Sequence, residues 1–132
     1  MILPTDTIVA VADGEKLHLF RNTGTETEMS LVAAADQDVE PVAGMGGSNS
    51  SAGNPDESRV EEAGFATGIV DMLNKRVLAG KFSNIVIIAA PKTLGEMRKH
   101  YHKKLEEALV GEIAKDLTGH PIADIEKTIL AA

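Results

Sequence analysis

The chain has 132 residues, no cysteine and a net charge of −7. This length suits a single domain with its own core, which we expect over residues 1–132. The absence of cysteine excludes disulfides and zinc–thiolate sites. No apolar run reaches the length of a membrane span, and the first residues lack a basic and apolar leader. We therefore expect a cytoplasmic protein without membrane contact.

The charge is unevenly distributed along the chain. Residues 1–56 hold nine acids and two bases, whereas residues 57–132 hold eleven of each. An acidic domain lacks the general attraction to phosphate on which non-specific nucleic-acid binding depends. Any contact with nucleic acid is therefore expected at a local basic patch.

The first third of the chain predicts an antiparallel meander. Residues 7–12 form an uninterrupted apolar and β-branched run, which is typical of a strand buried on both faces. An Asp-Gly pair at residues 13–14 predicts a two-residue hairpin turn, and alternation over residues 16–22 predicts a second strand. After a turn near residues 23–25, a third strand is expected at roughly residues 29–35.

Residues 38–55 are rich in glycine and serine and show no periodicity, which predicts a flexible loop. A loop of this length inside a domain is usually functional or disordered. Its glycine N–H groups are suited to contact a phosphate or to order on a partner. Gly46, Gly47 and Ser48 are therefore candidate binding residues, and the alternative is a plain connector.

A long helix and a buried strand are expected next. Asn54 and Pro55 suit a helix start, apolar residues recur at helical spacing from Phe65 to Val77, and Ala79-Gly80 predicts the stop. The apolar run over residues 84–90 predicts a strand buried on both faces.

Two further helices and a fifth strand complete the prediction. Thr93 and Glu96 have capping-box spacing and predict one helix that buries residues as far as Leu105. Residues 108–114 predict the strand. Pro121 predicts the start of the last helix, whose inward side chains are expected to be those of Ile122, Ile125 and Ile129.

These elements define an α/β fold in the order βββαβαβα. Alternation of strands and helices in the second half implies parallel pairing with right-handed crossovers. We therefore expect a five-stranded mixed sheet with helices on both faces, which is the ribonuclease-H-like order.

Four segments, which together span nearly the whole chain, carry a family resemblance. They are Leu3-Pro4 with Asp6-Thr7 and Val11-Ala12-Asp13-Gly14-x4-Leu19-Phe20-Arg21-Asn22; Phe65-Ala66; Ala89-Ala90-Pro91-Lys92-Thr93-Leu94-Gly95-Glu96-Met97-Arg98-Lys99; and Lys115-Asp116-Leu117-Thr118 with Pro121. In these segments the chain resembles the bacterial host-attachment proteins. It is distantly similar to the central domain of archaeal and eukaryotic peptide-release factors.

The resemblance implies a ribonuclease-H-like fold and a role connected with host attachment or with the ribosome. The release-factor domains carry a Gly-Gly-Gln tip in the loop after the third strand. This chain has Gly46-Gly47-Ser48 there. The missing glutamine disfavours peptidyl-tRNA hydrolysis.

A basic stretch is the second candidate site. Between Lys92 and Lys104 there are five bases and one acid. On the predicted helix, Lys92, Lys99 and Lys103 can share one exposed cationic sector, which suits a phosphate or the RNA backbone. The alternative is a solvated helix face whose cations offset the helix dipole. The candidate binding residues are Lys92, Thr93, Arg98, Lys99 and Lys103.

Carboxylates and histidines give little support for an active site. A nuclease of the ribonuclease H type needs several carboxylates at strand ends to hold metal ions. Asp13 follows the first strand, but Ala89-Ala90-Pro91 at the end of the fourth strand offers none, and Asp71 is expected to face solvent. The four histidines are not expected to converge. No catalytic residue, metal or cofactor is therefore predicted.

The sequence favours a non-enzymatic binding module that contacts RNA or the ribosome through the basic helix and the Gly-rich loop. One alternative is a hydrolase, either a metal-dependent nuclease or a peptidyl-tRNA esterase. Another is a regulatory module with an indirect role in host attachment, for which an acidic chain suits a basic protein partner. The open face of the first three strands, or the edge of the third, would then carry the interface.

Overall fold

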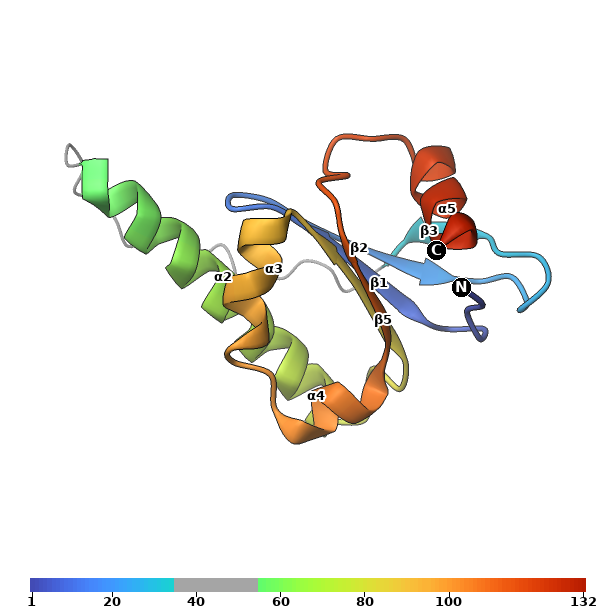
Figure 1. Ribbon diagram of the computed structural model, residues 1–132. Coiled ribbons are helices and arrows are strands. Elements are labelled where there is room, and N and C mark those ends of the chain that lie inside the picture. The colour runs from blue at the N-terminus through green and yellow to red at the C-terminus, as the bar shows by residue number, and fades with distance from the viewer. Residues whose placement is uncertain (35–54) are drawn as a thin grey trace.

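The computed structural model describes residues 1–34 and 55–132, which form one sheet with helices packed on it (Figure 1). The expected mixed α/β class is confirmed, as is the five-stranded mixed sheet. The strands are β1 (Ile8–Ala12), β2 (Leu17–Asn22), β3 (Leu31–Ala33), β4 (Ile85–Ala89) and β5 (Leu109–Ala114). The helices are α2 (Pro55–Leu78), α3 (Pro91–Arg98), α4 (Lys103–Ala108) and α5 (Ile122–Ala131).

The strands lie in the order β3-β2-β1-β4-β5. β2 is antiparallel to both of its neighbours, which confirms the predicted meander. β1 is parallel to β4, with Ile8 opposite Ile85, and β4 is parallel to β5. Every residue of β1 and β4 is buried, as their unbroken apolar runs predicted, because both faces of these central strands are covered.

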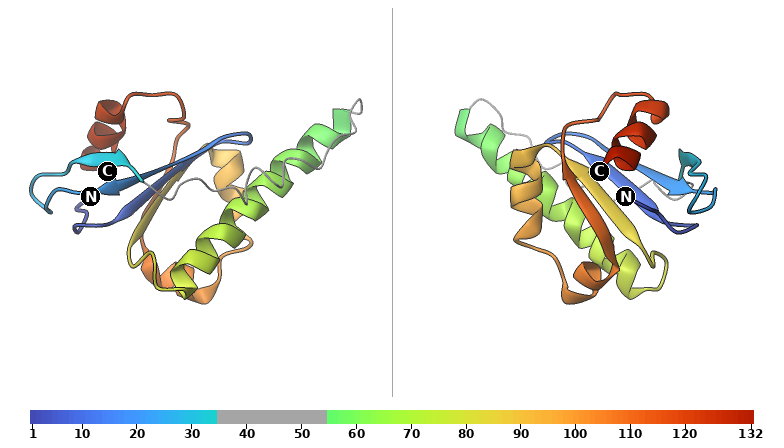
Figure 2. Two further views of the ribbon diagram at one scale, coloured as in Figure 1. Left: turned by 180° about the vertical axis from the view of Figure 1, so that it is seen from behind. Right: turned by 45° about the vertical axis from the view of Figure 1, so that its right-hand side comes forward.

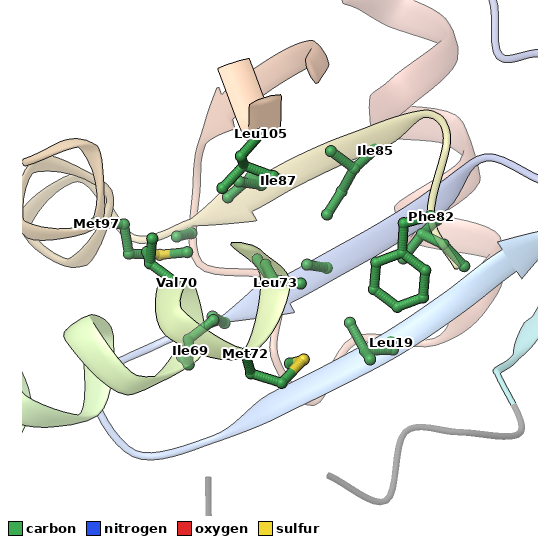
Figure 3. Packing of buried hydrophobic residues seen from close by; sticks show 14 of the residues in the cluster. Leu19, Ile69, Val70, Met72, Leu73, Phe82, Ile85, Ile87, Met97 and Leu105 are labelled. Carbon is green, nitrogen blue, oxygen red and sulfur yellow. The ribbon is translucent and has the colours of Figure 1, made fainter. Parts of the chain in front are cut away.

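Helices cover both faces of the sheet, as predicted (Figure 2). Successive strand residues point to opposite faces. Ile8 and its alternate neighbours therefore pack under α2, α3 and α4, whereas Val9 and Val11 pack under α5. Figure 3 shows Ile69 and Leu73 of α2 directed at the first face of the sheet.

The β1–β2 hairpin forms one residue later than the Asp-Gly pair suggested. The Asp13 N–H donates to the Lys16 carbonyl, so the chain reverses over Gly14 and Glu15. The Asp13 carboxylate accepts hydrogen bonds from the N–H groups of Glu15 and Lys16, at 2.7 and 2.6 Å. Asp13 therefore flanks the turn and stabilises it with its side chain.

The turn between β2 and β3 is built around a buried asparagine. The side-chain oxygen of Asn22 accepts from the N–H groups of Gly24 and Ser30, both at 3.0 Å, and its amide donates to the Leu3 carbonyl. A Cβ on Gly24 would collide with the backbone carbonyl of Glu28 and would lie 2.9 Å from the Ser30 nitrogen. Only glycine fits there without a backbone shift.

Two finer predictions are wrong, the length of the third strand and the inward side chain of Ile122. β3 is shorter than residues 29–35. Residue 35 and the expected cap Asn54 lie outside the described residues. Ile122 is 37% exposed, because it opens α5 beyond the sheet, whereas Ile125 and Ile129 are buried as expected.

The largest correction concerns the helix expected from Thr93 to Leu105. α3 begins at Pro91, which suits the first helical position, so Thr93 is its third residue and not its cap. α3 then ends at Arg98, and α4 begins at Lys103 after a short linker.

In the described ranges, no helix is both long and apolar enough to cross a membrane.

Candidate functional site

The structure separates the predicted site residues. Gly46, Gly47 and Ser48 lie outside the described residues. The basic stretch does not form one helical face, because α3 and α4 are distinct helices. An eight-residue helix is about 12 Å long. Lys92 and Thr93 lie at the start of α3, Arg98 and Lys99 at its end, and Lys103 at the start of α4.

A side chain from α2 shapes the linker between α3 and α4. The Asn74 amide donates to the His100 carbonyl at 3.2 Å, and its oxygen accepts from the His102 N–H at 3.0 Å. The His100 carbonyl and the His102 N–H are therefore hydrogen-bonded although α3 has already ended. His102 then caps α4, since its Nδ1 accepts from the Lys104 N–H at 2.9 Å.

Four lysines lie beside these contacts, and together with Asn74 we call this region the basic junction. Lys75 directly follows Asn74, and α4 packs against α2, so the lysines come from two parts of the chain (Figure 1). All four are exposed. Two are in ion pairs that link neighbours on the same segment, Lys99 with Glu96 at 3.1 Å and Lys104 with Glu107 at 3.6 Å. The four lysines are Lys75, Lys99, Lys103 and Lys104.

Arg98 has a structural partner. Its guanidinium contacts Glu112 of β5, with Nε and Nη2 at 3.1 and 3.0 Å from the same carboxylate oxygen. The other oxygen of Glu112 accepts from the Tyr101 hydroxyl at 2.6 Å. The hydrogen bond and charge of Glu112 raise the pKa of Arg98. Arg98 therefore ties the end of α3 to β5 and is less available to a ligand than the predicted site assumed.

A second polar group lies where β1, β4 and β5 end. The hydroxyl of Thr118 is 2.8 Å from Oδ2 of Asp13 and 2.6 Å from Oδ1 of Asp116. A hydroxyl has one hydrogen to donate, so the two carboxylates compete for it. Partial burial opposes ionisation of Asp13, but the N–H groups of Glu15 and Lys16 and the Thr118 hydroxyl outweigh it and lower its pKa. Asp13 is thus a well-bonded turn residue.

The sequence analysis missed three of these positions. Asn74, Glu112 and Thr118 each form hydrogen bonds with residues that are distant in sequence, and the arrangement of the elements is needed to bring the partners together.

Asp71 is exposed, as expected. Among the residues that the structure describes, no three or more His, Asp or Glu side chains are placed to hold a metal ion.

The fold and these sites together define a mixed α/β domain with a lysine-rich junction on an otherwise acidic chain. Residues 6–129 match the bacterial archaeo-eukaryotic release factor family 12, and the chain belongs to this family. The match confirms the release-factor part of the resemblance, but it does not support a host-attachment name.

One curated relative is the uncharacterized protein RP470 of Rickettsia prowazekii (strain Madrid E). It is 32% identical over 74 residues, which are 54% of this chain and 49% of the relative. The chain therefore spans about half the length of this relative.

Proposed function

We propose that this domain is a non-enzymatic module that binds RNA, in the context of the ribosome, through the basic junction. The observation that carries the proposal is that Asn74 bonds α2 to the α3–α4 linker, and that four exposed lysines, Lys75, Lys99, Lys103 and Lys104, directly follow Asn74 or flank that linker in a chain whose net charge is −7. Membership of a release-factor family supports an RNA partner. The Gly46–Ser48 segment stays a predicted second contact.

The junction suits phosphates better than bases. Lysine ammonium groups are flexible point charges, and such contacts position a protein on the nucleic-acid backbone without reading sequence. Lys99 and Lys104 would exchange weak, exposed pairs with Glu96 and Glu107 for phosphate oxygens. The chain as a whole is acidic and offers the RNA backbone no general attraction, so RNA binding should depend on these lysines and should weaken steeply with salt.

The test is co-sedimentation of the protein with ribosomes at low and high salt. Salt-sensitive migration with a ribosomal subunit is expected, and the double variant Lys99→Glu/Lys103→Glu should stay at the top of the gradient. Lys127→Glu is the matched control, because this exposed lysine belongs to α5 on the opposite face of the sheet. Equal binding by the double variant and the control would exclude the junction.

The ribonuclease-H-like relationship is part of the same proposal. The strand order β3-β2-β1-β4-β5, with β2 antiparallel to both neighbours and helices on both faces, supports it. The hydrolase alternative has one supporting observation, the approach of Asp116 to Asp13 through Thr118 at the strand ends. Nuclease activity that is lost in Asp13→Asn, with folding retained, would favour that alternative.

The protein-partner alternative through the edge of β3 has a specific obstacle. The outward N–H of Leu31 is already bonded to the Glu126 carboxylate of α5, at 2.8 Å. An added strand would have to displace this contact. We therefore rank this alternative below RNA binding.

A further inference from the structure

The first turn of α3 holds backbone donors for which the described part of the chain supplies no acceptor. Its cap residue is Ala90, whose side chain accepts no hydrogen bond, and Pro91 has no N–H to donate. The Leu94 N–H bonds to the Ala90 carbonyl at 2.8 Å. Within residues 1–34 and 55–132, the N–H groups of Lys92 and Thr93 have no hydrogen-bond partner. Two adjacent donors thus open this helix.

The side chain of Thr93 adds an independent observation. Thr93 is only 9% exposed, and its hydroxyl forms no hydrogen bond with any part of the chain that the structure describes. Buried hydroxyls in folded proteins almost always hydrogen-bond. A threonine in a helix commonly bonds to the carbonyl one turn back, as Thr128 does to Asp124, but Thr93 does not. The hydroxyl therefore has no acceptor among the described residues and is free to donate to a ligand.

Charge favours an anionic acceptor. Lys92 is exposed, and the structure shows no ion pair for it among the described residues. The start of a helix carries partial positive charge, which adds to that of the ammonium group. The carboxylates of Asp13 and Asp116 belong to the same edge of the sheet, but each is already bonded to donors in its own turn.

We propose that the first turn of α3 binds a single phosphate group, as part of a phosphomonoester. The N–H groups of Lys92 and Thr93 and the Thr93 hydroxyl would donate to its oxygens, and the Lys92 ammonium would offset its charge. This site is distinct from the basic junction, which lies at the other end of α3, about 12 Å away. It does not depend on RNA binding there.

The experiment is a phosphate titration of the whole chain, followed by the backbone amide signals of Lys92, Thr93 and Leu94 in NMR spectra. Ionic strength is held constant with sodium chloride. Saturable shifts confined to these amides are expected. Thr93→Val, which keeps the side-chain shape and removes the hydroxyl, should weaken binding at least about tenfold, since a hydrogen bond to a charged group is lost. Thr93→Ser should bind like the natural chain.

Lys127→Gln is the control, because this exposed lysine belongs to α5 on the opposite face of the sheet, and it should leave the phosphate affinity unchanged. Adenosine 5′-monophosphate and RNA oligonucleotides with a 5′-phosphate or a 5′-hydroxyl identify the source of the group. Larger shifts of the Lys92 and Thr93 amides with the 5′-phosphorylated RNA than with the 5′-hydroxyl RNA would assign the site to RNA ends, whereas stronger binding by adenosine 5′-monophosphate than by either RNA would assign it to a mononucleotide. Shifts that do not saturate, or equal affinity in Thr93→Val, would overturn the proposal.

Discussion

Tyr101 donates its hydroxyl hydrogen to Glu112 across 2.6 Å, and this bond joins the α3–α4 linker to the edge strand β5. Arg98 binds the other oxygen of the same carboxylate. One side chain of β5 thus holds both the end of α3 and the linker that follows it. Burial and the Glu112 carboxylate together raise the pKa of Tyr101 above its ordinary value.

The raised pKa of Tyr101 predicts a loss of stability at alkaline pH. The folded chain keeps the phenol proton at a pH where the unfolded chain loses it, near the ordinary value of about 10. The contribution of the Tyr101 phenol to the free energy of unfolding is therefore complete below about pH 10, and it falls as the pH rises toward the pKa of the folded chain. Tyr101 is partly exposed, so the decline should be less than about 1.4 kcal/mol per pH unit.

Tyr101→Phe isolates this effect, because phenylalanine keeps the ring and has no proton to lose. The free energy of unfolding, measured with urea from about pH 8 to about pH 11, should fall less steeply in the variant than in the natural chain. The substitution leaves every other side chain in place, so the difference between the two curves is the informative quantity. Parallel curves would show that the phenol does not contribute.

Asn74 should contribute to stability through the linker that it bonds. Asn74→Ala removes the donor to His100 and the acceptor for His102, and we expect a loss of about 1–2 kcal/mol. Asn74→Asp keeps the acceptor for His102 but sets a carboxylate oxygen against the His100 carbonyl, so it should cost at least as much as Asn74→Ala. Urea denaturation measures both. Unchanged stability in Asn74→Ala would show that the two bonds contribute nothing.

Gly24 should tolerate no side chain. In Gly24→Ala the new Cβ would collide with the Glu28 carbonyl, and the cost is expected to exceed about 2 kcal/mol. The matched control is Gly95→Ala within α3, where nothing lies near the added Cβ and the higher helix propensity of alanine should stabilise by up to about 1 kcal/mol. Thermal unfolding should move the two midpoints in opposite directions.

The lowered pKa of Asp13 predicts a contribution to stability that is lost in acid. The folded pKa lies below that of the unfolded chain, so the contribution is present above about pH 4 and disappears as pH falls through the folded value. Thr118→Val removes one donor to this carboxylate and should flatten the acid branch of the stability curve. Asp13 is only partly buried and keeps its two backbone donors in the variant, so the change should stay below about 1 kcal/mol. An unchanged acid branch would contradict the role of Thr118.

The strands were predictable because their signal is local. The runs around Val9 and Ile87 are apolar without alternation, and only strands buried on both faces of a sheet require this. The regular spacing from Ile69 to Leu73 likewise identified α2 as a helix packed on the sheet. Parallel pairing followed from the alternation of elements and needed no knowledge of individual contacts.

The site was less predictable because it depends on contacts between distant segments. Leu94, Met97 and Leu105 have spacing compatible with one helix, yet Asn74 supplies the hydrogen bonds that let the chain turn between them. Asp13 looked isolated because its partner Thr118 follows a strand two places away in the sheet. Neither relationship is visible until the sheet order is known.

The contact between Glu126 and Leu31 has a consequence for synthesis of the chain. During translation β3 leaves the ribosome long before α5, so its edge and the Val9 face of the sheet stay uncovered until α5 has emerged. Open edges and apolar faces are where nascent chains associate wrongly or recruit chaperones. Docking of α5 covers both the edge and the face. The emergence of α5 is therefore the step that ends this vulnerable period, and ribosomes that stall before it would release an association-prone protein.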